Sequence, residues 1–148
     1  QNSFLTVTLG ILDPENHTFH YVRAGHTPLV LVNPSRKNRT KVLQPGGTAL
    51  GMIRSERFRK ILEPAMISLR PGDLLVQFTD GITETMNRSR EEFGMDRLTD
   101  LLNRMYGSET DYICYKVESA LDQFKGKEEQ MDDIALLAFR WNQEESPL

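Results

Sequence analysis

The sequence predicts an α+β domain built on antiparallel β-structure. In the first half of the chain, short apolar and β-branched segments alternate with turns that contain Pro, Gly and Asn. Two longer segments with apolar residues at helical spacing follow, and one more apolar segment comes after them. Consecutive strands followed by consecutive helices favour an antiparallel sheet, because a doubly wound parallel sheet would alternate strands with helices.

The first half is expected to form strands over residues 4–12, 18–24 and 29–32. A turn at residues 13–16 separates the first two, because Pro14 presets φ and Asp and Asn side chains bond their own backbone. Such short connections predict an antiparallel meander. Further strands are expected over three segments, which are residues 40–43, 58–69 and 74–78.

The second half is expected to form helices over residues 95–106 and 109–124, whose apolar residues recur every three or four positions. Asp96 is a candidate N-cap, and Gly107 and Gly126 are candidate stops. A last strand over 134–141 and a polar tail over 142–148 complete a single predicted domain, spanning residues 1–148 and ordered over about residues 4–141.

Composition excludes several classes of protein. Hydrophobic residues make up 39% and charged residues 26%, which supports a packed core. A single cysteine allows no internal disulfide and suits the cytoplasm. The net charge of −3 argues against nucleic-acid binding, and no apolar run approaches the ~20 residues of a membrane span. The chain begins with Gln1 and has no leader pattern, so we expect a piece of a longer protein.

Two acidic positions stand beside apolar strands. Asp80 follows the segment 74–78 and precedes Gly81, which leaves room for a metal ion, although Thr79 or Asp80 could instead cap a short helix. Asp132 and Asp133 precede the last strand, where acids also serve as gatekeepers against aggregation. Both interpretations of each position remain open on local sequence.

The pair is more informative than either position alone. Asp80 and Asp132 are 52 residues apart (132 − 80), with both predicted helices between them. A helical hairpin outside the sheet would return the last strand beside segment 74–78 and bring both carboxylates to one end. Oxygen ligands suit Mg²⁺ or Mn²⁺, and His17, His20 and His26 show no zinc-binding pattern.

Four segments, in order, resemble the metal-dependent (type 2C) serine/threonine protein phosphatases, in their bacterial SpoIIE-like branch. They are Tyr-Val-Arg-Ala-Gly-His-Thr-Pro at 21–28, Gly-Thr-Ala-Leu-Gly at 47–51, the segment 72–84 with Thr-Asp-Gly at 79–81, and Asp-Asp-Ile-Ala-Leu-Leu at 132–137. The resemblance covers nearly the whole chain.

The resemblance implies an antiparallel β-sandwich flanked by helices, with two Mn²⁺ or Mg²⁺ ions at one end. It implies that Asp80 and Asp132 are catalytic metal ligands and that Gly81 and Asp133 belong to the same metal site. Structural positions near the site are expected at four residues, which are Gly25, His26, Gly51 and Glu84.

The implied activity is hydrolysis of phosphoserine or phosphothreonine on a regulatory protein by a metal-activated water, in bacterial stress or sigma-factor signalling in the cytoplasm. The implied partners are a phosphoprotein, such as an anti-anti-sigma regulator, and an upstream sensor or receiver domain.

Two departures from the family pattern qualify this expectation. The family's N-terminal Gly-Asp block, whose acid bridges both metals, has no counterpart, because the only Gly-Asp pair here is Gly72-Asp73. We therefore expect the N-terminal part of the domain to be missing, the 148 residues alone to be inactive, and an exposed sheet face to favour self-association. The alternative function is a non-catalytic partner-binding module. Ala135 also stands where the family commonly has Thr or Ser.

Overall fold

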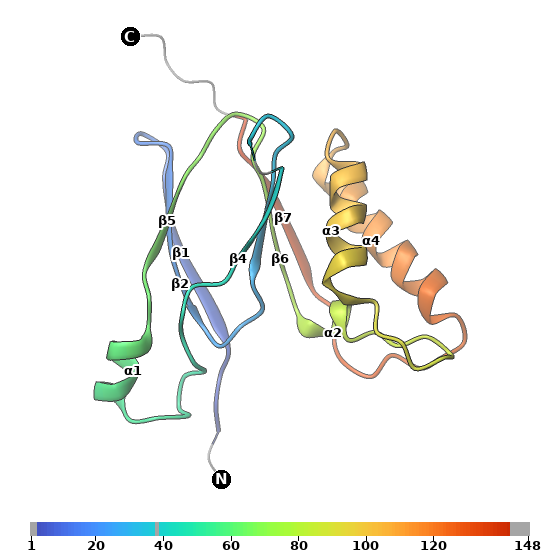
Figure 1. Cartoon of the computed structure of the whole chain (residues 1–148), viewed down its shortest axis with the longest axis horizontal. Helices are drawn as coiled ribbons and strands as arrows, with labels where there is room; N and C mark the ends of the chain where they lie inside the picture. The colour runs from blue at the N-terminus through green and yellow to red at the C-terminus, as the bar shows by residue number, and fades with distance from the viewer. Residues whose placement is uncertain (1–2, 38, 143–148) are drawn as a thin grey trace. The chain divides into compact units, whose positions relative to one another are not determined.

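The computed structural model describes residues 3–37 and 39–142, which divide into two compact units (Figure 1). The first unit contains the described residues up to Pro28, the segment Leu43–Pro71, and the residues from Trp141. The second contains Leu29–Val42 and Gly72–Arg140. Of the predicted polar tail, residues 143–148 lie outside the described part.

The first unit is built on a three-stranded antiparallel sheet with the order β1-β2-β5. Its strands are β1 (Val7–Asp13), β2 (Thr18–Ala24) and β5 (Ala65–Ser68). A short helix, α1 (Ser55–Ile61), precedes β5. Trp141 is buried in this unit, and the ring of His17 lies edge-on to it with 5.7 Å between the ring centroids.

The two faces of this sheet differ in exposure. Tyr21 and Ile67 lie on one face and are buried. On the opposite face, Ile11 pairs with His20, which in turn pairs with Met66. Leu9, Ile11 and Met66 on that face are 62%, 68% and 56% exposed, so the unit presents an uncovered apolar strip.

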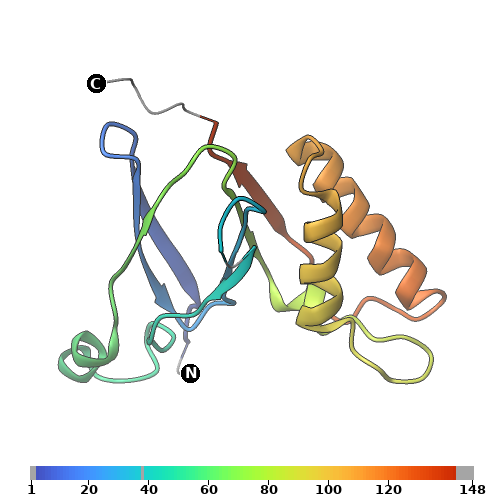
Figure 2. The same ribbon diagram turned by 45° about the horizontal axis from the view of Figure 1, so that its top comes forward.

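The second unit is built on a four-stranded sheet with the order β4-β3-β6-β7. Its strands are β3 (Leu29–Val32), β4 (Thr40–Leu43), β6 (Leu74–Phe78) and β7 (Leu136–Arg140). Three helices complete the unit: α2 (Asp80–Thr83), α3 (Gly94–Met105) and α4 (Thr110–Lys125). Figure 2 shows α3 and α4 side by side near β7.

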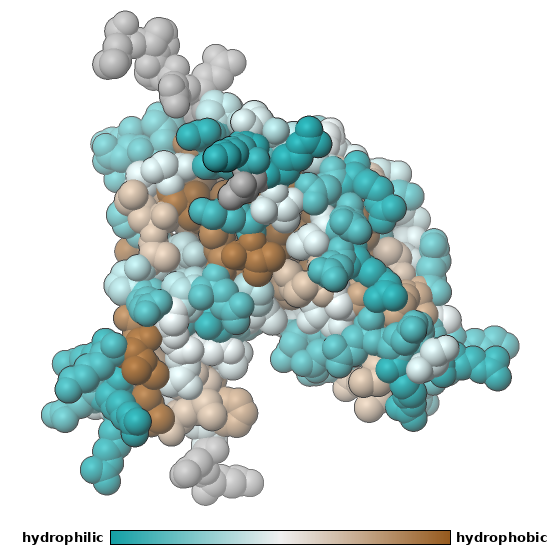
Figure 3. Space-filling view, viewed as in Figure 1, coloured by the Kyte–Doolittle hydropathy of each residue, from teal (hydrophilic) through white to brown (hydrophobic). Residues whose placement is uncertain are grey.

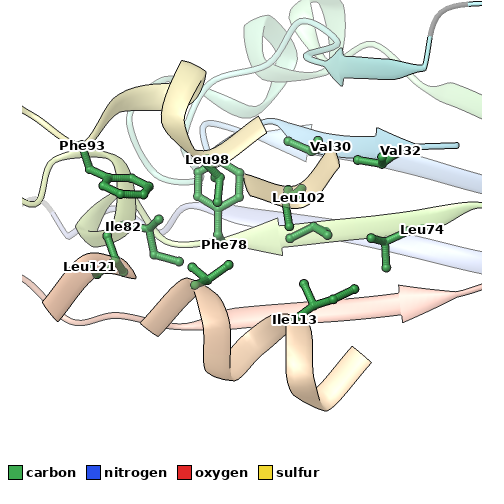
Figure 4. Packing of buried hydrophobic residues seen from close by; sticks show 12 residues of the cluster. Val30, Val32, Leu74, Phe78, Ile82, Phe93, Leu98, Leu102, Ile113 and Leu121 are labelled. Carbon is green, nitrogen blue, oxygen red and sulfur yellow. The ribbon is translucent and has the colours of Figure 1, made fainter. Parts of the chain in front are cut away.

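The core of the second unit lies between one sheet face and the helices (Figure 4). Alternate strand residues point into it, and the helices contribute leucines and β-branched residues at helical spacing. Complete burial of each such side chain contributes ~1.5–3 kcal/mol relative to leaving it exposed. The fully buried residues are Val30, Val32, Leu74, Val76, Ile82, Leu98, Leu102, Ile113, Val117 and Leu121. This packing fixes the ends of β6 and β7.

The predicted α+β class with antiparallel sheets is confirmed, as are the two long helices and the stop at Gly126, which has φ of 64°. The meander is wrong, because β3 joins the second sheet instead of pairing with β2. Asp96 is also not an N-cap, since α3 begins at Gly94. Among the described residues, no helix is long and apolar enough to cross a membrane.

The single strand predicted over residues 58–69 is also wrong, since Ser55–Ile61 forms α1 and only Ala65–Ser68 forms a strand. Glu56 lies in the first turn of α1 and two basic residues lie in the last, which complements the helix dipole. Phe58 and Ile61 are three residues apart, which places them on one face of a helix but on opposite faces of a strand. Figure 3 shows hydrophilic side chains over this helix.

Candidate functional site

Antiparallel pairing of β6 with β7 brings the two predicted acidic positions to one end of the sheet. Phe78, the last residue of β6, pairs with Leu136, the first residue of β7. Residues 79–81 (the first acidic segment) therefore leave the sheet where residues 132–135 (the second acidic segment) enter it. The prediction that the helical hairpin would place strand 74–78 beside the last strand is confirmed.

The side chain of Thr79 joins the two segments. Its hydroxyl donates a hydrogen bond to the carbonyl oxygen of Asp133 at 2.9 Å and accepts one from the N–H of Ala135 at 2.9 Å. The N–H of Thr79 also donates to the carbonyl oxygen of Ala135 at 3.0 Å. Thr79 occupies the N-cap position of α2, but its side chain makes no capping hydrogen bond. The short helix and the N-cap position of Thr79 agree with the capping interpretation, but the hydroxyl bonds the second acidic segment instead of the helix.

Gly81 allows the two segments to approach closely. A Cβ atom at this position would lie 2.5 Å from the carbonyl oxygen of Asp133 and 3.2 Å from that of Asp132. Any side chain here would separate the segments, so the glycine is required by packing. Gly81 is buried, whereas Asp80 beside it is exposed.

Gln130 adds polar contacts around this junction. Its side-chain amide lies 3.1 Å from the carbonyl oxygen of Asp132 and 3.4 Å from that of Gly81, both within hydrogen-bond range. The hydroxyl of the buried Thr85 also donates to the Gly81 carbonyl at 2.6 Å. Protein donors thus already contact the carbonyl oxygen of Gly81, and the geometry adds no support for its predicted role as a metal ligand.

The carboxylates of Asp80 and Asp132 both lie at the surface. Oδ1 of Asp80 accepts the N–H of Gly81 at 3.1 Å, and Oδ1 of Asp132 accepts the N–H of Asp133 at 2.7 Å. Each carboxylate is therefore oriented by the backbone of the residue that follows it. Asp133 is exposed, and its carbonyl oxygen is the one that faces Thr79 and Gly81.

The donor set suits a hard divalent cation in kind, because its side-chain donors are carboxylate oxygens. Over residues 3–37 and 39–142, however, no three His, Cys, Asp or Glu side chains form a group able to hold a metal ion. Asp80 and Asp132 can therefore supply only part of a coordination shell.

The remaining predicted positions have structural surroundings. Gly25 and Gly51 have φ of 73° and 88°, and a Cβ on Gly25 would lie 2.5 Å from the backbone nitrogen of Ala49. Nδ1 of His26 lies 3.3 Å from the hydroxyl of Thr6. These residues belong to the first unit and are described within it. In the second unit, Glu84 is exposed and its N–H donates to the carbonyl oxygen of Asp80 at 2.8 Å.

Sequence reasoning missed the contributions of Thr79 and Gln130 to this site. Thr79 precedes an Asp-Gly pair at a helix start, so a local cap was the simpler interpretation of its hydroxyl. Gln130 follows a charged loop and carries no motif, so only the folded structure identifies its contacts.

Residues 1–142 match the family described as Stage II sporulation protein E (SpoIIE). Protein IcfG from Synechocystis sp. is 29% identical over 136 residues, which are 91% of this chain and 20% of that protein. The structure resembles the SiaA-PP2C domain of Pseudomonas aeruginosa with a TM-score of 0.79 and 20% identity, covering 93% of this chain and 52% of that one. It also resembles the manganese-presoaked phosphatase domain of SpoIIE from Bacillus subtilis, with a TM-score of 0.63 and 21% identity, covering 95% and 58%.

Proposed function

The chain belongs to the Stage II sporulation protein E (SpoIIE) family, and on that premise we propose that it is part of a phosphatase that hydrolyses phosphoserine or phosphothreonine on a regulatory protein. The fold is that of PP2C phosphatase domains. The chain spans about half of these solved domains and a fifth of IcfG, so both of its units are proposed to form part of one larger catalytic domain.

The close packing of the two acidic segments is the observation that carries the proposal. Three hydrogen bonds between Thr79 and residues 133–135, together with the contact at Gly81, fix the backbone on both sides. Asp80 and Asp132 project from this fixed backbone and remain accessible to water. Preorganised carboxylates of this kind bind ions without having to be ordered first.

We assign Asp80 and Asp132 as metal ligands, with Asp133 beside them, and Mn²⁺ or Mg²⁺ as the ions. When bound, two such ions lower the pKa of a coordinated water and stabilise charge on a phosphate. The chain's own contribution is to orient the carboxylates: Gly81 and Asp133 donate their N–H groups to the Oδ1 atoms. Support for manganese comes from the SpoIIE structure, which was presoaked with that ion.

The incomplete donor set leads us to propose that these 148 residues alone bind ions weakly and turn over little substrate. The described residues offer no group of three donors, and one or two carboxylates rarely hold a divalent ion without help from substrate oxygens. The proposed substrate is a small phosphoprotein in bacterial regulation, and the proposed location is the cytoplasm. A non-catalytic binding role is the competing function for the isolated chain.

Calorimetric titration of Mn²⁺ into the chain and into the longer protein that contains it tests the assignment. We expect Asp80→Asn and Asp132→Asn each to weaken binding by about tenfold or more, as loss of a charged ligand should. Asp100→Asn is the matched control, since Asp100 is exposed on α3 and outside the acidic segments. Unchanged binding and unchanged phosphatase kinetics in both site variants would remove these carboxylates from the site.

Activity distinguishes the enzyme from the binding module. Manganese-dependent turnover of p-nitrophenyl phosphate is expected from the longer protein and is expected to be lost in its Asp80→Asn variant. If the longer protein has no turnover, the catalytic proposal fails. Robust turnover by the 148 residues alone would show that the proposed weak ion binding is wrong.

A further inference from the structure

A groove of about 600 Å³ lies in the second unit between α4 and the residues that lead into β7. Its volume is in the range of ligand-binding pockets. The groove has an apolar floor, and Figure 4 shows Ile82 and Leu121 from this floor at the same end of the core. The floor residues are Ile82, Val117, Leu121, Ile134 and Leu136.

Acidic side chains surround this floor. Asp111, Glu118 and Asp122 line the groove from one side of α4, at intervals of about two helical turns and one turn. Lys125 is the lining residue of opposite charge, and its ammonium group lies 3.5 Å from Asp122. The rim therefore carries three negative charges and one positive charge. All three acids are exposed.

Aromatic and aliphatic surface extends this groove. Tyr115 and Ile134 both line it and are 57% and 40% exposed. Contact with an apolar side chain would remove this surface from water, which favours binding. An apolar floor with an acidic rim selects against anionic ligands and favours a ligand that is both apolar and cationic.

We propose that this groove docks a segment of a protein partner that carries apolar anchor residues flanked by Lys or Arg. The anchors would contact the exposed surface of Tyr115 and Ile134, above the buried floor, and the cationic flanks would face Glu118 and Asp111. This binding site goes beyond the proposed hydrolysis and does not require bound metal.

The groove adjoins the candidate metal site through Gln130. Gln130 lines the groove, and its amide lies 3.1 Å from the carbonyl oxygen of Asp132. Ile82 lines the groove and directly follows Gly81. A docked segment would therefore contact the exposed Gln130 beside the second acidic segment, so docking and phosphate-ester binding would occur next to each other.

Cys114 provides a specific probe of occupancy. It lines the groove and is the only cysteine in the sequence. Burial raises the pKa of its thiol, and the Asp111 carboxylate raises it further. Alkylation by iodoacetamide at mildly alkaline pH, followed by mass spectrometry, reports how accessible this one site is.

The test uses three short fluorescent peptides: leucines flanked by lysines, the same leucines flanked by glutamates, and serines flanked by the same lysines. We expect only the first to bind in an anisotropy titration and to slow Cys114 alkylation. Glu118→Lys should weaken that binding by about fivefold, because it replaces an attraction by a repulsion at the rim. Asp100→Lys makes the same charge change on α3, away from the groove, and should leave affinity within about twofold.

Several outcomes would overturn the proposal. In the titration, these are no binding by the leucine–lysine peptide, or equally tight binding by the serine peptide or the glutamate peptide. In the other assays, they are binding that leaves Cys114 fully reactive, or an equal loss of peptide affinity in Glu118→Lys and Asp100→Lys. Binding should persist in Asp80→Asn, so loss of phosphatase activity and loss of docking are separable results.

Discussion

Replacing Gly81 by alanine tests how closely the two acidic segments are packed. The new Cβ would lie 2.5 Å from the carbonyl oxygen of Asp133, whereas ordinary contacts begin at 3.4 Å. One segment must therefore move by about 0.9 Å (3.4 − 2.5). If the Asp133 carbonyl takes up that movement, its 2.9 Å hydrogen bond from the Thr79 hydroxyl is broken or badly strained.

The expected cost follows from two opposing effects. Overpacking typically costs ~1–3 kcal/mol, and loss of one hydrogen bond adds ~0.5–1.5 kcal/mol. Alanine is favoured over glycine within a helix by up to ~1 kcal/mol, but Gly81 lies in the short helix α2, where this gain is smaller. We therefore expect Gly81→Ala to lower the free energy of unfolding by ~1–3 kcal/mol.

Urea denaturation followed by circular dichroism measures this change. Gly107→Ala is the matched control, because a Cβ at Gly107 would meet no atom within 4 Å. That variant should be neutral or stabilised by up to ~1 kcal/mol through the entropy of the unfolded chain. Equal stability of Gly81→Ala and Gly107→Ala would refute the close approach of the two segments. Manganese titration of Gly81→Ala should show weaker binding than the unsubstituted chain, since its carboxylates are no longer held by a fixed backbone.

Three further variants test other contacts. Thr79→Val keeps the side-chain shape but loses both hydroxyl bonds to residues 133–135, and should cost ~1–2 kcal/mol in the same denaturation assay, where no change would exclude this role. Arg36→Met removes the ion partner of the buried Asp73 and should cost ~3 kcal/mol, far more than Arg39→Met at an exposed position, and a cost no larger would contradict this. The hydrogen bond to Asp73 raises the pKa of Arg36, so this contribution should be present at neutral pH and be lost only at strongly alkaline pH. The raised pKa of the Cys114 thiol predicts slower alkylation than glutathione at the same pH, and a faster rate would refute it.

Sequence patterns predicted the features that depend on long periodic segments. The apolar spacing in residues 95–106 and 109–124 indicated the helices α3 and α4, and a helical hairpin outside the sheet predicted that the last strand returns beside β6, as observed. The pairing of β6 with β7 brings Asp80 and Asp132 to one end of the sheet, because each lies just outside one of the two paired strands. Whether these carboxylates hold a metal ion stays a prediction.

Features that depend on tertiary contacts could not be predicted from the sequence. Phe58 and Ile61 have the spacing of one helix face, but α1 has only 7 residues, so no further periodicity supported a helix there. The strand Leu29–Val32 follows β2 closely, yet it pairs with β6, whose residues are more than 40 positions further along the chain. The hydroxyl of Thr79 likewise has its partners over 50 residues away, where no local rule could locate them.

The buried indole of Trp141 gives this chain a built-in optical reporter. Trp141 is the only tryptophan in the sequence, and it belongs to the first unit although it directly follows β7 of the second. Its emission should therefore shift to longer wavelength when the first unit opens, because water then reaches the ring. Far-ultraviolet dichroism is dominated by α3 and α4 of the second unit. Comparing the two signals during one melting experiment would show whether the two units unfold together or one before the other.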